Sequence, residues 1–340
     1  MASKKQSYTY LLLALSTLSF IVNSSIAADC VGSGAISVYW GQHKDDETEG
    51  TLKETCDSGY YKIVILESLI VYDDGQTPTL NLANHCGPLT TPCSQLEETI
   101  KHCQDLGIKV FLSIGLNQTP KLASSNSSSS DDASVTKVLA NYLLENFLSG
   151  NPGPLGSVFL DGIDIADVVA TKNLQWDELV KAISEFTSER KIYLSAAPQC
   201  VYPDYYLGAA IQTGLFDYIW VEFFYQNPSC IYSDGSAASL IKEWKRWTSG
   251  VPNSKIFLGV TATKEIAGYI APDVLKSDVL PTIRGSSNYG GVMVWDRYYD
   301  RLGGYSKQIK DSVGKTCRCV CDDELASMNF YALKARPFPM

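Results

Sequence analysis

The stretch Ser157-Val-Phe-Leu-Asp-Gly-Ile-Asp-Ile-Ala-Asp-Val-Val169 is an apolar run that ends in acidic residues. Its aspartates are Asp161, Asp164 and Asp167. The apolar part predicts a buried β-strand, and side chains that follow such a strand often line a functional site in α/β proteins. Because residues alternate faces along a strand, we expect Asp164, Ala166 and Val168 to point the same way, into the protein interior.

Seven more apolar runs of this kind recur along the chain, separated by turns and amphipathic segments. The expected strands are Ala35–Trp40, Lys62–Ser68, Lys109–Ile114, Ser157–Ile165, Lys191–Ala196, Asp217–Phe224, Lys255–Val260 and Gly290–Trp295. The clearest helical segments are Gln95–Leu106, Ser134–Phe147, Trp176–Phe186, Leu240–Trp247 and Tyr305–Val313. This alternation predicts parallel βαβ units closed into a single-domain α/β fold, the (β/α)8 TIM barrel. An open doubly wound sheet is the alternative, but no glycine-rich phosphate loop follows the first strand.

The first 27 residues have the pattern of a secretory signal peptide. Lys4 and Lys5 precede the apolar stretch Tyr10–Val22, and Ser25-Ile-Ala27 supplies small residues for cleavage. We therefore expect a protein that is secreted to the extracellular space or reaches the vacuole through the secretory pathway. Residues 28–316 would form the barrel, and residues 317–340 a cysteine-containing tail.

Charge and cysteine content narrow the possible partners. Removal of the two lysines of the signal peptide changes the net charge from −9 to −11. An acidic chain without a run of Lys and Arg argues against nucleic acid and anionic membranes as partners. Ten cysteines in a secreted chain predict disulfides, and the three histidines lack ligand spacing, so we expect neither a metal nor a cofactor. Sequons at Asn117 and Asn126 predict a glycoprotein.

The C-terminal ends of the expected strands carry aromatic residues next to carboxylates. In a barrel of this type these ends form the functional site, and aromatic rings beside hydrogen-bonding groups suit a sugar. The first strand is also followed by an acidic loop, Asp45, Asp46, Glu47 and Glu49. If Glu67, Asp164 and Glu222 meet at one barrel end, at least one should have a raised pKa. The candidate glycan-binding residues are Trp40, Glu67, Asp164, Glu222, Phe224, Tyr225 and Trp295.

Several segments resemble the plant class III chitinases of the hevamine type, which belong to glycoside hydrolase family 18. The matching segments are Tyr39-Trp-Gly-Gln42, Gly75-Gln-Thr-Pro78, Ala196-Ala-Pro-Gln-Cys200, Thr213-Gly-Leu-Phe-Asp217 and Tyr289-Gly-Gly-Val-Met-Val-Trp295. The resemblance covers nearly the whole mature chain and implies the (β/α)8 barrel. It also implies the disulfides Cys56–Cys103, Cys86–Cys93 and Cys200–Cys230.

The resemblance fails where the family places its catalytic residues. The family motif D-x-x-D-x-D-x-E matches at Asp161 and Asp164, but its third aspartate falls on Ala166 and its proton-donating glutamate on Val168. A one-residue bulge would instead align Asp167 with the third aspartate of the motif and Val169 with its proton-donating glutamate. Both registers put valine at the acid position, so we expect no catalytic residue. The family tyrosine on the sixth strand falls on Phe224 or Tyr225.

These departures favour a protein that is not an active enzyme. The leading interpretation is a secreted chitinase-like lectin of plant defence that binds N-acetylglucosamine or chitin oligosaccharides as a monomer. A protein inhibitor of microbial glycosidases, of the xylanase-inhibitor type, is the alternative. A seed storage protein and an active endochitinase complete the list.

The three implied disulfides leave four cysteines, Cys30, Cys317, Cys319 and Cys321. In a (β/α)8 barrel the first strand begins on the face where the last helix ends. The chain before Ala35 and after Val313 is long enough for the two ends to meet. We therefore expect Cys30 to bond one of the three tail cysteines, with the pairing of the other two left open.

Overall fold

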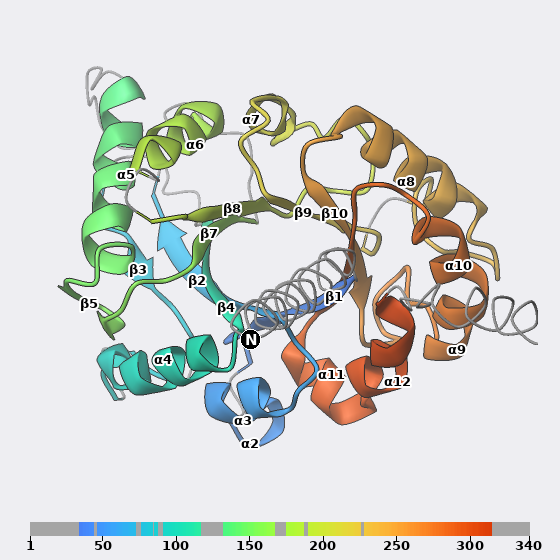
Figure 1. Cartoon of the computed structure of the whole chain (residues 1–340), viewed down its shortest axis with the longest axis horizontal. Helices are drawn as coiled ribbons and strands as arrows, with labels where there is room; N and C mark the ends of the chain where they lie inside the picture. The colour runs from blue at the N-terminus through green and yellow to red at the C-terminus, as the bar shows by residue number, and fades with distance from the viewer. Residues whose placement is uncertain are drawn as a thin grey trace, which may run out of the picture. The chain divides into compact units, whose positions relative to one another are not determined.

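The computed structural model describes residues 34–43, 46–72, 76–83, 85–87, 91–116, 132–166, 175–186, 190–225 and 228–314. Within these ranges eight parallel strands close into a barrel, and the expected (β/α)8 fold is confirmed (Figure 1). The barrel strands are β1 (Ala35–Trp40), β2 (Ile63–Val71), β4 (Lys109–Leu116), β7 (Gly162–Ile165), β8 (Tyr193–Ala196), β9 (Tyr218–Glu222), β10 (Lys255–Thr261) and β11 (Tyr289–Trp295).

Closure is visible in the first strand, which pairs with both the second and the last. Val38 of β1 lies opposite Val64 of β2 on one side and Val294 of β11 on the other. A short strand, β3 (Thr79–Leu80), adds to β2 in the antiparallel direction. Residues 1–27, where a signal peptide is expected, lie outside the described residues, as do Cys30, both sequons, residues 167–169 and the tail after Gly314.

The expected strand Ser157–Ile165 is wrong in its first half. Gly156–Ser157 (β6) pairs antiparallel with Pro152–Gly153 (β5), and only Gly162–Ile165 joins the barrel. Glycine is required in this hairpin, because Gly156 has a φ of +88° and a Cβ on Gly153 would lie 2.2 Å from the Asn146 carbonyl oxygen. The chain therefore turns before it enters the barrel.

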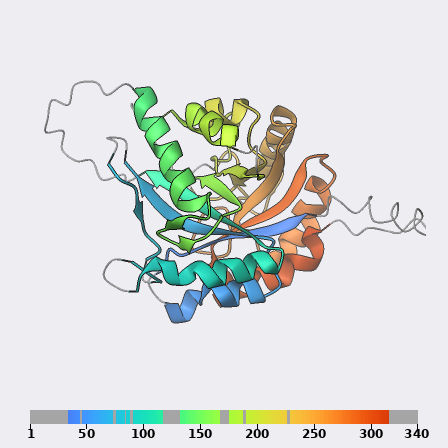
Figure 2. The ribbon, with the colours of Figure 1, turned by 60° about the vertical axis from the view of Figure 1, so that its left-hand side comes forward.

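Helices surround the strands (Figures 1 and 2). Four of the helices expected from an amphipathic period with one buried stripe are present, each with at least one end within two residues of the expected end. They are α5 (Asp132–Phe147), α6 (Trp176–Glu185), α8 (Ala238–Gly250) and α12 (Tyr305–Val313). Within the described part of the chain, no helix has the length and apolar character needed to cross a membrane. The helices are α2 (Asp46–Glu49), α3 (Leu52–Asp57), α4 (Glu97–Asp105), α5 (Asp132–Phe147), α6 (Trp176–Glu185), α7 (Gly208–Gln212), α8 (Ala238–Gly250), α9 (Pro272–Val274), α10 (Leu280–Ile283), α11 (Arg297–Gly303) and α12 (Tyr305–Val313).

Alternation along the strands divides the apolar residues into two layers. One layer lies between strands and helices and includes Trp40, Val64 and Leu112. The other fills the barrel interior and includes Tyr39, Ile65, Phe111, Trp220, Phe257 and Met293. Neighbouring residues in β1 thus belong to different layers, which decides where each side chain of the site can lie.

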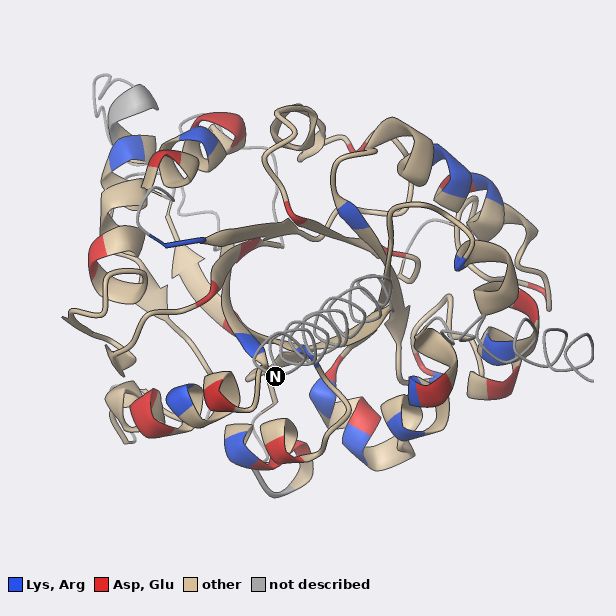
Figure 3. Cartoon of the chain, viewed as in Figure 1, with Lys and Arg blue, Asp and Glu red and all other residues tan. Residues whose placement is uncertain are grey.

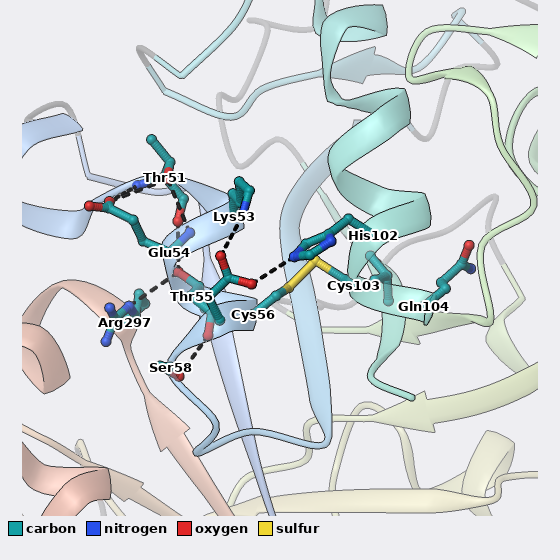
Figure 4. The surroundings of a disulfide bond; sticks show 12 residues. Thr51, Lys53, Glu54, Thr55, Cys56, Ser58, His102, Cys103, Gln104 and Arg297 are labelled. Atoms are coloured by element: carbon teal, nitrogen blue, oxygen red, sulfur yellow. Dashed lines mark hydrogen bonds and ion pairs between the residues drawn. A yellow bond between two sulfur atoms is a disulfide. The ribbon is translucent and has the colours of Figure 1, made fainter. Parts of the chain in front are cut away.

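The three disulfides implied by the family resemblance are present, namely Cys56–Cys103, Cys86–Cys93 and Cys200–Cys230. Cys56–Cys103 ties α3 to α4 (Figure 4). Helix α3 begins at a capping box, in which Thr51 and Glu54 satisfy each other's backbone N–H groups. These links hold two outer helices in place beside β1 and β2.

Candidate functional site

Asp164 is the centre of a hydrogen-bond network in the barrel interior. Its Oδ2 atom accepts hydrogen bonds from the Tyr39 hydroxyl at 2.8 Å and the Ser113 hydroxyl at 3.0 Å. Its Oδ1 atom accepts from the Ser195 hydroxyl at 2.6 Å and the Trp220 indole N–H at 2.9 Å. The donors come from β1, β4, β8 and β9, so this one carboxyl group links five strands. It is fully buried.

Burial raises the pKa of Asp164, and the four donated hydrogen bonds oppose that rise without cancelling it. The expectation that one carboxyl of the group has a raised pKa is therefore confirmed, although desolvation is the main cause rather than repulsion between like charges. Burial also raises the pKa of Tyr39, and the charge of Asp164 adds to the effect. Both groups are enclosed, so they organise the interior and offer no exposed proton donor.

Ala166 follows Asp164 on the same face of the chain, as the alternation predicts. It is 5% exposed and packs in the interior cluster with Ala197 and Phe224. Its backbone N–H donates to the Ile114 carbonyl at 3.1 Å, so the pairing with β4 continues through this residue. The side chain beyond Asp164 on this face is therefore apolar, where the family motif has a carboxylate. Asp167, Val168 and Val169 lie outside the described residues.

Trp295 lies at the end of β11 and belongs to the same interior cluster. Its ring centroid is 5.2 Å from that of Tyr39 and 6.4 Å from that of Phe224. Phe224 is 2% exposed, whereas Tyr225 is 45% exposed and has a φ of +74°. Of the two positions open to the family tyrosine, Phe224 is the one that faces the interior. Trp295 keeps part of its ring exposed at the C-terminal end of the barrel.

Glu67 and Glu222 reach the same region from β2 and β9. Glu67 is 4% exposed and Glu222 is partly buried. Glu67 follows the interior residue Ile65 by two positions and Glu222 follows Trp220 by two, so strand alternation directs both carboxylates inward. Their charges also contribute to the raised pKa of Tyr39. The structure thus brings together Glu67, Asp164, Glu222, Phe224 and Trp295 at this end of the barrel, which we call the C-terminal mouth.

The prediction that Trp40 lines this mouth is wrong. Trp40 is 1% exposed and lies in the outer layer, because its neighbour Tyr39 occupies the inward position on β1. Its indole N–H donates to the Gly50 carbonyl at 3.0 Å, and its ring lies 4.2 Å from that of His85. Trp40 therefore secures the loop after β1 and cannot reach a ligand at the mouth.

Glu49, the last residue of the acidic loop after β1, turns inward. It is fully buried, accepts from the Gly41 N–H at 3.0 Å and lies 2.6 Å from the His85 Nε2 atom. This carboxylate anchors the loop and is not available to a partner. Asp45 and the side chains of Asp46 and Glu47 lie outside the described residues.

Sequence reasoning missed a second group at the rim, His43 with Asp296 and Tyr298. His43 Nε2 lies 2.8 Å from Asp296 Oδ2, and the His43 ring stacks on Tyr298 at 3.9 Å. Burial lowers the pKa of His43, but the hydrogen bond and charge of Asp296 outweigh it, so the pKa is raised. Asp296 also caps α11 through the Tyr299 N–H at 3.3 Å. The pair joins the loop after β1 to the start of α11.

Comparisons with known proteins agree with this geometry. Residues 35–269 match the family described as Glycosyl hydrolases family 18. The chain belongs to glycosyl hydrolase family 18. It is 45% identical over 321 residues to an acidic endochitinase of Vitis vinifera, across 92% of this chain and 100% of that protein. The resemblance to the plant endochitinases of this family is thereby confirmed.

Two solved structures that are similar to this chain have other descriptions. One is a tamarind chitinase-like lectin, 49% identical, with a TM-score of 0.74 over 82% of this chain and 99% of that chain. The other is the xylanase and α-amylase inhibitor protein XAIP-II of Scadoxus multiflorus, 39% identical, with a TM-score of 0.71 over 82% of this chain and 98% of that chain. One family 18 scaffold is thus found in proteins described as chitinase, lectin and inhibitor.

Proposed function

We propose that this protein is a secreted chitinase-like lectin of plant defence that binds N-acetylglucosamine or chitin-type oligosaccharides at the C-terminal mouth without cleaving them. The observation that carries the proposal is the apolar surface at Ala166, followed by valine at both candidate positions of the catalytic acid. The lectin among its relatives, at 49% identity, supports the same interpretation.

The mouth has the chemistry of a sugar site. Trp295 is partly exposed there and can cover the apolar face of a pyranose ring, with the buried Phe224 packed behind it. Glu222 is also partly exposed and can accept hydrogen bonds from sugar hydroxyls or an acetamide N–H, whereas Glu67 lies beneath the surface. Apolar surface with a few polar groups is the usual composition of a small-ligand site.

Hydrolysis needs a proton donor at the glycosidic oxygen, and general acid catalysis of this kind contributes about 10²- to 10⁴-fold. Valine has no proton to give. Asp164 cannot substitute for the missing acid, because it is fully buried and all four of its donors come from the protein. The mouth therefore favours binding over turnover.

Calorimetric titration of chitotetraose into the mature protein tests the binding. We expect one site whose affinity falls at least tenfold in Trp295→Ala, because the aromatic contact is removed. Tyr205→Ala is the matched control, since Tyr205 is 85% exposed and lies after β8, away from the interior cluster. Absence of binding to the native protein, or an equal loss in both variants, would contradict the proposal.

A second candidate is a protein inhibitor of microbial glycosidases. The observation that favours it is the high exposure of the Tyr205 side chain. The loop that carries Tyr205 is pinned by Asp204, which accepts N–H hydrogen bonds from Gln199, Tyr206 and Leu207 at 3.0, 2.8 and 2.6 Å. An exposed tyrosine on a rigid loop is a suitable anchor for a protein interface. A microbial xylanase whose inhibition is lost in Tyr205→Ala and kept in Trp295→Ala would select this candidate.

A further inference from the structure

The N-terminal end of the barrel, opposite the mouth, carries a cluster of lysines, namely Lys109, Lys191 and Lys255. Backbone hydrogen bonds show that Lys109 and Lys255 lie beside the first residues of neighbouring strands. Lys109 N–H donates to the Lys62 carbonyl at 3.0 Å, and Lys255 N–H donates to the Asp217 carbonyl at 2.9 Å. Figure 3 shows basic segments on the ring of strands. This cluster is unexpected in a chain with a net charge of −9.

Two of the lysines converge on one ring. The Lys109 and Lys191 Nζ atoms lie 5.0 Å and 5.3 Å from the centroid of Tyr193. Lys109 and Lys255 each lie two residues before an interior residue of the same strand, Phe111 and Phe257, so strand alternation directs them to the interior face. Two ammonium groups thus lie beside Tyr193, and the third, that of Lys255, donates to the Ser287 carbonyl at 3.5 Å at the same end of the barrel.

The aromatic base of this cluster is formed by Tyr193 and Tyr218, whose ring centroids are 5.7 Å apart. Both residues are partly exposed. Burial raises the pKa of Tyr218, so its hydroxyl stays protonated and remains a hydrogen-bond donor at neutral pH. The cluster therefore combines positive charges with O–H donors, the groups that an anion requires.

Two carboxylates, those of Asp161 and Asp217, lie near these lysines and keep their negative charge. Asp161 Oδ2 accepts from the Val110 N–H and the Gln104 side chain, both at 2.9 Å. Asp217 accepts from the Leu194 N–H at 3.0 Å, and its other oxygen lies 2.7 Å from Lys191 Nζ. Among the residues that the structure describes, no ion pair joins a carboxylate to Lys109 or Lys255. Arg190 also lies 3.6 Å from Asp161 Oδ1, so the three lysines and Arg190 outnumber the two carboxylates, and a positive excess remains at this end.

We propose that the N-terminal end of the barrel binds a compact multivalent anion of the phosphate or sulfate class, held by Lys109, Lys191 and Lys255 over Tyr193 and Tyr218. Ammonium groups form short charge-assisted hydrogen bonds with such oxyanions, and the phenol hydroxyls add neutral ones. Phe111, Trp220 and Phe257 fill the interior between the two ends and are at most 2% exposed. The anion site and the glycan site are therefore separate.

Calorimetric titration of pyrophosphate into the mature protein at low ionic strength tests this proposal. We expect one site, weakened by added salt, with about tenfold lower affinity in Lys109→Met and in Lys191→Met. Methionine keeps an apolar stem and a polarisable sulfur over Tyr193, so the fold is retained, as an unchanged Tm would verify. Tyr193→Phe, which loses only the hydroxyl, should weaken binding less.

The control variant is Lys245→Met, since Lys245 is an exposed lysine on α8 outside the cluster. It should bind pyrophosphate as the native protein does. Absence of binding to the native protein at millimolar pyrophosphate, or an equal loss in the control, would overturn the proposal. If the lysines only cover the aromatic end of the barrel, their replacement changes the Tm and no anion binds, which also overturns it.

Discussion

Trp220 donates its indole N–H to Asp164 at 2.9 Å, inside a barrel whose strands β7 and β9 are separated by β8. The same carboxyl oxygen, Oδ1, also accepts from Ser195 on the intervening strand at 2.6 Å. Asp164 is thus a structural centre of the barrel as well as the residue that aligns with the second aspartate of the family motif. This structural role does not depend on any catalytic role of the motif.

Asp164→Ala should destabilise the protein strongly. The substitution leaves four buried donors without their acceptor, and each unsatisfied buried group costs about 1–3 kcal/mol, so we expect a loss of about 3–5 kcal/mol after partial relaxation. Denaturant unfolding measures the difference. Asp273→Ala, at an exposed position in α9, should change the free energy of unfolding by less than about 0.5 kcal/mol. Equal effects of the two substitutions would contradict the structural role of Asp164.

The His43–Asp296 pair should make stability depend on pH. The folded-state pKa of His43 is raised above the unfolded value, so protonated His43 stabilises the fold below the unfolded pKa. That contribution is lost as the pH rises through the folded pKa. The Tm difference between native protein and His43→Gln should therefore be larger at pH 5.5 than at pH 8.5. A difference that is constant, or that grows with pH, would show that the pair does not form as described.

Reintroducing an acid should not restore high activity. Val168→Glu combined with Ala166→Asp, or Val169→Glu for the shifted register, supplies a carboxyl group near the motif's acid position. Phe224 still occupies the interior position of the family tyrosine, and it lacks the hydroxyl that would hold the substrate acetamide. We expect chitin oligosaccharide hydrolysis to stay near background. Rates approaching those of an active plant endochitinase would show that the mouth is otherwise intact.

The terminal cysteines should form a disulfide that links the two ends of the chain. Peptide mapping under non-reducing conditions is expected to recover Cys30 joined to Cys317, Cys319 or Cys321. Closing so long a loop stabilises by about 4–5 kcal/mol on the entropic account, which is an upper value. Recovery of Cys30 as a free thiol would refute this link.

The sequence predicted the scaffold well because hydrophobic alternation and helical period report burial directly. Ala35–Trp40 and Tyr305–Val313 are matched at both ends. The strand expected from Ser157 began too early, since Gly153 and Gly156 form a hairpin whose turn the apolar content concealed.

The mouth was predicted less completely. Trp40 was placed there because aromatic residues at a strand end suit a sugar, but β1 can present only Tyr39 or Trp40 to the interior. His43 and Asp296 are 253 residues apart in sequence, and no local pattern signals their contact. Contacts made by the closing of a barrel between its first and last strands depend on tertiary structure alone.

Binding and turnover measured in one sample test the central claim most directly. Chitotetraose is incubated with the mature protein at a concentration that saturates the site, and mass spectrometry follows the oligosaccharide over a day. We predict that the bound tetrasaccharide stays intact, while an active plant endochitinase of this family, run in parallel, converts it to shorter products. Products formed at more than about one per cent of that enzyme's rate, above the roughly 10⁻² to 10⁻⁴ of the rate that remains when a general acid is lost, would contradict the claim that this protein binds chitin oligosaccharides without cleaving them.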